Sequence, residues 1–199
     1  MKHPWTLALI MMVATTGPSQ TSEETQEPEL MPCADTGVFQ SDYGFSVRIP
    51  AGLTGCLNSP SGIRRHGVLI PLDAEPGNAW VECYTGYADY ETVSEALEFW
   101  LGTVRQHGEK VVILSRRSAR LGRLPAQRAV LQYQVKDSGE ELRREMVVGL
   151  RNVVSSQGYK ITIEYLVDLV TPETRYAADR LKYNKILSSW KTEPTLDGP

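Results

Sequence analysis

The feature that most restricts the fold of this 199-residue chain is a single helical pattern set between runs of strand-like sequence. Thr92-Val-Ser-Glu95 has the capping-box pattern, apolar residues then recur at helical spacing, and Gly108 ends the run. Segments on both sides of this helix alternate apolar and polar residues or form short apolar runs, as β-strands do. The predicted strands are Phe45–Ile49, His66–Leu72, Ala79–Thr85, Lys110–Ser115, Gln127–Val135, Leu142–Arg151 and Tyr159–Asp168.

Turn residues and a second helical pattern complete the predicted domain. Asp137-Ser-Gly139 and Ser155-Ser-Gln-Gly158 separate consecutive strands, so these strands should form antiparallel hairpins. A C-terminal helix should be capped by Thr171, with Pro172 at its first position. Its buried stripe should comprise Tyr176, Tyr183, Leu187 and Trp190. This order predicts an α+β fold, an antiparallel β-sheet packed with two main helices.

Residues 1–20 have the pattern of an export signal, because the apolar stretch Trp5–Val13 follows a basic start and precedes small polar residues. This stretch is far shorter than the about 20 residues that a transmembrane helix requires. We therefore expect a signal peptide that is cleaved before Gln20 or nearer Ala14, and no transmembrane segment. The mature protein should be exported, either periplasmic or secreted.

Residues 21–37 are acidic, contain proline and lack an apolar period, which predicts a disordered leader. A lipoprotein signal ending at Cys33 is an alternative, but Pro32 stands where a small residue is needed. Residues 38–192 should form a single domain, and residues 193–199 a disordered tail. The sequence contains no Asn-x-Ser/Thr glycosylation site, which favours a bacterial envelope protein.

Three cysteines follow the signal, namely Cys33, Cys56 and Cys83. In an exported protein, an odd number of cysteines predicts one disulfide and one remaining thiol. We predict that Cys56 pairs with Cys83, since both lie in strand-like segments whereas Cys33 lies at the edge of the leader.

Basic residues gather in the centre of the chain, where no acidic residue occurs between Glu109 and Asp137. Guanidinium groups suit phosphate and carboxylate groups, so this run predicts a surface for another protein or an anionic envelope component. The alternative is that Glu140, Glu141 and Glu145 on the next strand neutralise the run. Nucleic acid is disfavoured by export. The binding candidates are Arg116, Arg117, Arg120 and Arg123.

Tyrosines precede the first helix at three-residue spacing, and of these Tyr84 and Tyr87 are further binding candidates. Tyrosines on a loop can contact a sugar or a protein. The alternative is that they pack the corner between strand and helix.

Residues suited to catalysis or metal binding are few. His66 and His107 are the only histidines after the signal, so we predict no metal site and no cofactor. A nucleophilic pair of Cys56 or Cys83 with His66 is conceivable, but a disulfide beside a loop histidine suits the exported compartment better.

Three segments of the chain resemble the Mog1/PsbP-like group, which includes small bacterial envelope proteins of the DcrB type. They are Tyr43-Gly-Phe-Ser-Val-Arg-Ile-Pro50, Leu121-Gly-Arg-Leu-Pro-Ala126, and Tyr159-Lys-Ile-Thr-Ile-Glu-Tyr165 before a helix ending Ile186-Leu-Ser-Ser-Trp190. The resemblance implies a non-catalytic binding or assembly factor and transfers no functional residues. The alternatives are a periplasmic inhibitor or immunity protein that blocks a toxic enzyme, and a Cys/His hydrolase.

Overall fold

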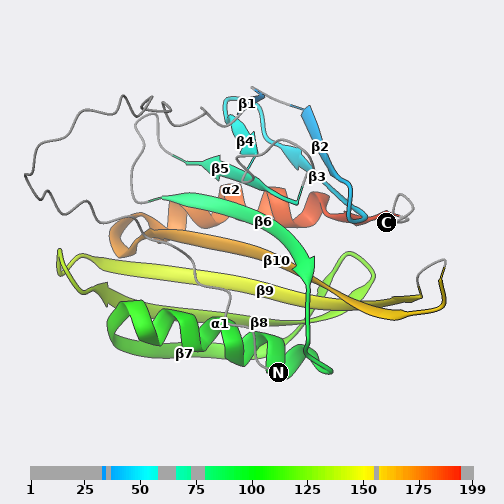
Figure 1. Ribbon diagram of the computed structural model, residues 1–199. Coiled ribbons are helices and arrows are strands. Elements are labelled where there is room, and N and C mark those ends of the chain that lie inside the picture. The colour runs from blue at the N-terminus through cyan, green and yellow to red at the C-terminus, as the bar shows by residue number, and fades with distance from the viewer. Residues whose placement is uncertain (1–32, 35–36, 58–65, 73–78, 155–156, 194–199) are drawn as a thin grey trace, which may run out of the picture.

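An eight-stranded antiparallel sheet forms the centre of the protein (Figure 1). The structure is a computed structural model that describes residues 33–34, 37–57, 66–72, 79–154 and 157–193. The strand order in this sheet is β1-β4-β5-β6-β10-β9-β8-β7, and a smaller sheet has the order β11-β3-β2. The strands are β1 Cys33–Ala34, β2 Gly37–Ser41, β3 Phe45–Ile49, β4 Gly55–Leu57, β5 Val68–Pro71, β6 Trp80–Tyr87, β7 Gly108–Leu121, β8 Leu124–Val135, β9 Glu141–Val154, β10 Lys160–Pro172 and β11 Lys191–Thr192. The helices are α1 Val93–His107 and α2 Tyr176–Ser189, and a 3-10 turn, Glu173–Arg175, precedes α2.

The four longest strands, β7 to β10, follow one another as antiparallel hairpins, which confirms the predicted meander. Strand β7 is longer than the predicted Lys110–Ser115, because it continues to a two-residue turn at Gly122 and Arg123. Gly122 has a φ of 58°, a left-handed conformation that glycine adopts without steric cost. The β7–β8 hairpin therefore carries the whole arginine-rich stretch from Arg116 to Arg128.

The two helices cover opposite faces of the large sheet (Figure 1). Helix α1 packs its apolar side, including Leu97 and Leu101, on β8 to β10. Helix α2 and the small sheet pack on the other face, where Phe45 and Tyr183 are fully buried. The sequence-based α+β prediction is thus confirmed. Neither helix in the described part of the chain is long and apolar enough to cross a membrane.

Helix α1 begins as its sequence predicts. The backbone N–H of Glu95 donates to Thr92 Oγ1 at 3.2 Å, and the Glu95 carboxylate accepts from the backbone N–H of Thr92 at 3.1 Å. This reciprocal capping box satisfies two backbone donors at the helix start.

Helix α2 begins later than predicted. Thr171 and Pro172 remain in β10, where Pro172 lies opposite Leu142 of β9, and the helix starts only at Tyr176. The Thr171 hydroxyl donates to Asp179 at 2.7 Å instead of capping the helix. The predicted stripe does face the core, since Tyr183 and Trp190 are buried and Tyr176 and Leu187 are partly buried against it.

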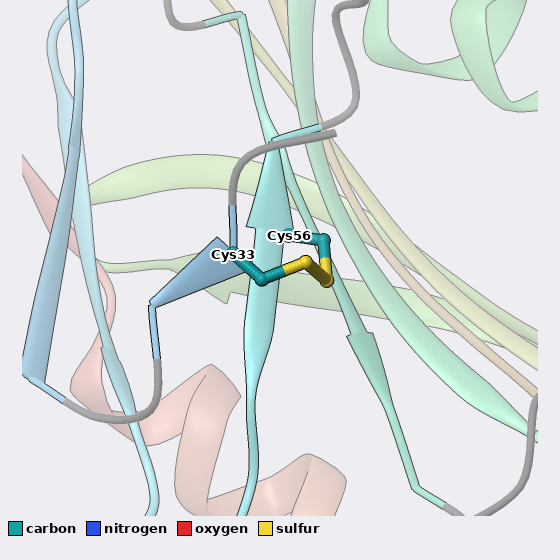
Figure 2. The surroundings of a disulfide bond; sticks show 2 residues. All are labelled: Cys33 and Cys56. Atoms are coloured by element: carbon teal, nitrogen blue, oxygen red, sulfur yellow. A yellow bond between two sulfur atoms is a disulfide. The ribbon is translucent and has the colours of Figure 1, made fainter. Parts of the chain in front are cut away.

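The disulfide prediction was wrong, because Cys33 pairs with Cys56 (Figure 2). Cys83 remains a buried free cysteine. Cys33 and Cys56 lie opposite each other on β1 and β4. Strand β5 separates β4 from β6. Cys56 lies opposite Leu69 of β5, and Leu69 lies opposite Glu82 of β6, the residue before Cys83. Since successive side chains in a strand point to opposite faces, Cys56 and Cys83 point away from each other.

The same disulfide places Cys33 and Ala34 in the large sheet, although the sequence assigned them to the disordered leader. Residues 21–32 of that leader, the predicted signal peptide 1–20 and residues 194–199 of the predicted tail lie outside the described residues.

Candidate functional site

The arginines predicted to form one binding surface are divided between the two faces and the end of the β7–β8 hairpin. Arg116 faces α1, where its guanidinium donates to Ser94 Oγ at 2.8 Å and forms an ion pair with Glu98. It also donates to Gln127 Oε1 of β8 at 3.1 Å. Arg116 therefore holds α1 against the hairpin, and its donors are occupied within the fold.

Arg117 faces the opposite side of the sheet and lies directly across from Arg128 of β8. This is the face on which the neighbouring Ala119 and Ala126 pack in the core beneath α2. Arg117 is exposed and makes no ion pair with any residue that the structure describes. Like charges directly opposite each other on neighbouring strands are destabilising. The fold therefore maintains a local excess of positive charge at this position.

The acidic partner of Arg128 is Glu145 of β9, which is fully buried. Its carboxylate accepts hydrogen bonds from Arg128 and from the Tyr176 hydroxyl, and Arg180 Nε of α2 lies 3.2 Å from Oε2. Of the three glutamates that the alternative expected to neutralise the arginine run, Glu145 thus pairs with Arg128. Burial and the nearby Glu145 raise the pKa of Tyr176 to about 12, so this hydroxyl remains a donor at neutral pH.

Arg117 lies opposite Arg128, and Arg128 and Arg180 share the single carboxylate of Glu145, so these residues carry more positive than negative charge. We call these three arginines the basic face. The Nε atoms of Arg128 and Arg180 are buried and make no hydrogen bond within the described chain. Positive charge is thus in excess on the basic face, and guanidinium groups suit phosphate or carboxylate groups.

Neighbouring side chains fix the position of Arg180. Its guanidinium lies 5.8 Å from the centre of the Tyr176 ring, and Arg143 lies 5.0 Å from the same ring. Arg143 is itself paired with Glu173, so it adds no net charge to the basic face. Arg180 was not predicted from the sequence, since no pattern links a residue of α2 to the distant β7–β8 hairpin.

The other two predicted arginines lie at the end of the hairpin. Arg120 is opposite Pro125, and Arg123 occupies the turn beside Gly122. Both are exposed and make no ion pair with described residues. Arg120 has the parity of Arg116, so it points to the side of the sheet opposite Arg117.

Tyr84 and Tyr87 do not form one surface. Tyr84 lies opposite Leu166 on the α1 side of the sheet, with its ring centre 6.3 Å from that of Trp100. Tyr87 points to the other side, where its ring centre lies 5.8 Å from that of Tyr43. The two candidates are thus separated by the sheet, as expected for neighbours of opposite parity on one strand.

The geometry gives no support to a cysteine nucleophile. Cys56 is oxidised in the disulfide. Burial, and to a lesser extent Glu82, raises the pKa of Cys83 far above its ordinary value, so the reactive thiolate does not form. The His66 ring is within hydrogen-bonding distance of the Tyr43 hydroxyl, at 3.2 Å. No group of three or more potential metal ligands occurs within the described ranges.

Two solved structures have a similar fold. The cyanobacterial PsbP protein (CyanoP) of Synechocystis sp. PCC 6803 superimposes with a TM-score of 0.52 at 13% identity, over 88% of this chain and 99% of its own. LpqN of Mycobacterium tuberculosis, described as involved in cell envelope biogenesis, gives a TM-score of 0.56 at 14% identity, over 81% of this chain and 92% of its own. No protein-family model and no curated protein matches the sequence. The chain has the Mog1/PsbP-like fold, as the resemblance predicted.

Proposed function

We propose that this protein is an exported, non-catalytic binding domain of the cell envelope, and that its basic face binds phosphate or carboxylate groups of another envelope component. The observation that supports this most is the juxtaposition of Arg117 and Arg128 with only the buried Glu145 to offset them and Arg180. Planar guanidinium groups bind these oxyanions through paired hydrogen bonds.

Three further observations agree with an envelope location. Residues 1–20 have the pattern of a signal peptide. The Cys33–Cys56 disulfide is of the kind that persists in oxidising compartments. LpqN, whose fold is similar, is described as acting in cell envelope biogenesis.

The proposal is tested by sedimentation of the exported protein with phosphatidylglycerol vesicles, with phosphatidylcholine vesicles as the uncharged control. We expect binding to the anionic vesicles only, which Arg117→Ser should weaken about tenfold by removing one charge-assisted contact. Lys185→Ser is the matched variant, since Lys185 is also exposed but lies on α2 away from the hairpin. Equal binding by all three proteins would contradict the proposal.

A competition experiment distinguishes a site for the phosphate group from a general attraction to the lipid surface. If the basic face recognises the phosphate group itself, inorganic pyrophosphate should displace the protein from the vesicles. Vesicle binding that pyrophosphate does not reduce would indicate a lipid surface effect rather than a site for the oxyanion.

A further inference from the structure

Four acidic side chains are buried in the described part of the chain, and one of them has no cationic partner. This residue is Glu164 of β10, which is only 5% exposed. The single hydrogen bond of its side chain to described residues comes from the Trp100 indole, whose Nε1 donates to Oε1 at 2.6 Å. The other three acids are ion-paired, Glu145 with Arg128, Asp168 with Arg144 and Asp179 with Arg175.

The second carboxylate oxygen of Glu164 remains available. Oε2 makes no hydrogen bond to the described residues, and it is not sealed from solvent. A buried carboxylate normally needs a charged partner to offset its loss of hydration. In its ionised form Glu164 therefore has both the charge and the free acceptor to engage a group from outside the chain.

A second aromatic ring, that of Tyr84, lies near this carboxylate. Glu164 lies opposite Gly86 of β6, and the absence of a side chain there makes room for Tyr84. A Cβ atom at Gly86 would lie 2.6 Å from the Tyr84 hydroxyl oxygen. The Tyr84 ring thus extends along β6 toward the position beside Glu164.

The rings continue from the sheet to the surface of α1. The ring centre of Trp100 lies 6.3 Å from that of Tyr84 and 5.5 Å from that of Phe99, and Phe99 lies 5.4 Å from Tyr90. Phe99 is 50% exposed, and the other three rings are partly exposed. We call Tyr84, Tyr90, Phe99 and Trp100 the aromatic cluster.

The chain segment that carries the aromatic cluster is acidic. Asp89 and Glu91 are exposed on the loop between β6 and α1, and no basic residue occurs from Tyr84 to Val104. Burial is the largest cause that raises the pKa values of Tyr84 and Tyr90, and the charge of Glu164 is the second. The pKa of Tyr90 is raised to about 12. Both hydroxyls therefore lie within electrostatic reach of the carboxylate.

We propose that Glu164 and the aromatic cluster form a binding site for an organic cation that carries an alkylated ammonium group. The faces of aromatic rings attract such cations, and a carboxylate supplies the counter-charge. An oxyanion would be repelled by Glu164, and a neutral apolar ligand would leave its charge uncompensated. The site lies on the α1 face of the sheet, opposite the basic face, so it does not depend on the proposed function.

The test follows the Trp100 indole N–H by NMR, assigned with the Trp100→Phe variant, while choline or tetramethylammonium is added. We expect a saturable shift of this resonance with both cations. The matched uncharged probe, 3,3-dimethylbutan-1-ol, has the shape of choline without its charge and should produce no saturable shift. A shift of equal size and affinity with the alcohol would overturn the proposal, as would the absence of saturable binding by both cations.

A pair of variants tests the role of the carboxylate. Glu164→Gln should weaken choline binding about tenfold or more, as expected for loss of a desolvated cation partner. Glu91→Gln removes one exposed negative charge from the same region and should change the affinity little. Equal affinities for wild type and Glu164→Gln would overturn the proposal.

The pH dependence of choline affinity can be measured on the wild-type protein alone. Burial raises the pKa of Glu164 to about 7, so its charge, and with it choline affinity, should decline as the pH falls through that value. The Glu164 carboxylate contacts the Trp100 indole of α1, and the Tyr84 and Tyr90 hydroxyls lie within its electrostatic reach. The other charged groups that act on these two tyrosines are Glu82 on Tyr84 and Asp89 on Tyr90. Both tyrosines stay neutral over this range because their pKa values are raised. Affinity that does not change between about pH 5 and about pH 8 would contradict the assignment.

Discussion

Arg117 of β7 and Arg128 of β8 lie directly opposite each other on the same face of the sheet, and only Arg128 has an acidic partner among the described residues. In a hairpin built for stability alone, an acid would be expected at one of these positions. Functional sites often retain locally unfavourable arrangements, and the repulsion between these two arginines is one. This pair is therefore central to the proposed anion site.

Replacing Arg117 should stabilise the domain. Arg117→Ser removes the repulsion with Arg128 and should raise the free energy of unfolding by about 0.2–1 kcal/mol, the range for a cross-strand pair. Urea unfolding measures this difference, with Lys185→Ser as the neutral reference. A loss of stability in Arg117→Ser would mean that Arg117 has a structural partner.

Replacing Arg116 should have the opposite effect. Arg116→Ser breaks the contacts with Glu98 and Ser94 that join β7 to α1, and should lower the free energy of unfolding by about 1 kcal/mol or less, since the pair is largely exposed. Amide hydrogen exchange in the first turns of α1 should become faster. Vesicle binding should not change, and its loss would assign Arg116 to the binding surface after all.

The disulfide can be tested by mass spectrometry of the exported protein. Without reductant, alkylation should modify no thiol in the native state and only Cys83 after denaturation, because Cys83 is fully buried. Peptide mapping should recover Cys33 linked to Cys56. Replacing both partners with serine should cost about 3 kcal/mol of unfolding free energy for a loop of this length. A linked peptide containing Cys83 would contradict the structure.

The stability of the domain should decrease as the pH rises from about 4.5 to about 7, because burial raises the pKa of Glu164 from 4.5 to about 7. In this interval the unfolded chain ionises Glu164 while the folded chain keeps it neutral, so ionisation favours the unfolded state. The contribution is about 3 kcal/mol, present in full below about pH 4.5 and lost above about pH 7. Urea unfolding of wild type and Glu164→Gln across this range should show that the variant lacks this loss. Parallel pH profiles would show that Glu164 is not buried as described.

Short sequence motifs predicted the parts of the fold that depend on contacts between residues close in sequence. Thr92 and Glu95 are three residues apart, so the start of α1 could be predicted from the sequence and is confirmed. Thr171 and Pro172 gave an equally local signal, but pairing of β10 with β9 extended the strand past them. Tertiary pairing here outweighs a capping preference of about 1 kcal/mol.

There is a physical reason why the long-range features could not be predicted from the sequence. The position of β5 between β4 and β6 decides which cysteines meet, and no pattern in the sequence gives strand order. Glu164 alternates with Ile163 and Tyr165, which is typical of a solvent-facing position, but α1 places Trp100 against it. Arg180 likewise reaches Glu145 only because α2 crosses that face.

The most direct test of the account is calorimetric titration of inorganic pyrophosphate into wild type, Arg117→Ser and Lys185→Ser at low salt. The account predicts saturable binding to wild type and Lys185→Ser with similar affinity, and an affinity about tenfold lower for Arg117→Ser. Saturable binding that is unchanged in Arg117→Ser, or no binding to wild type, would contradict the claim that the basic face is an oxyanion site.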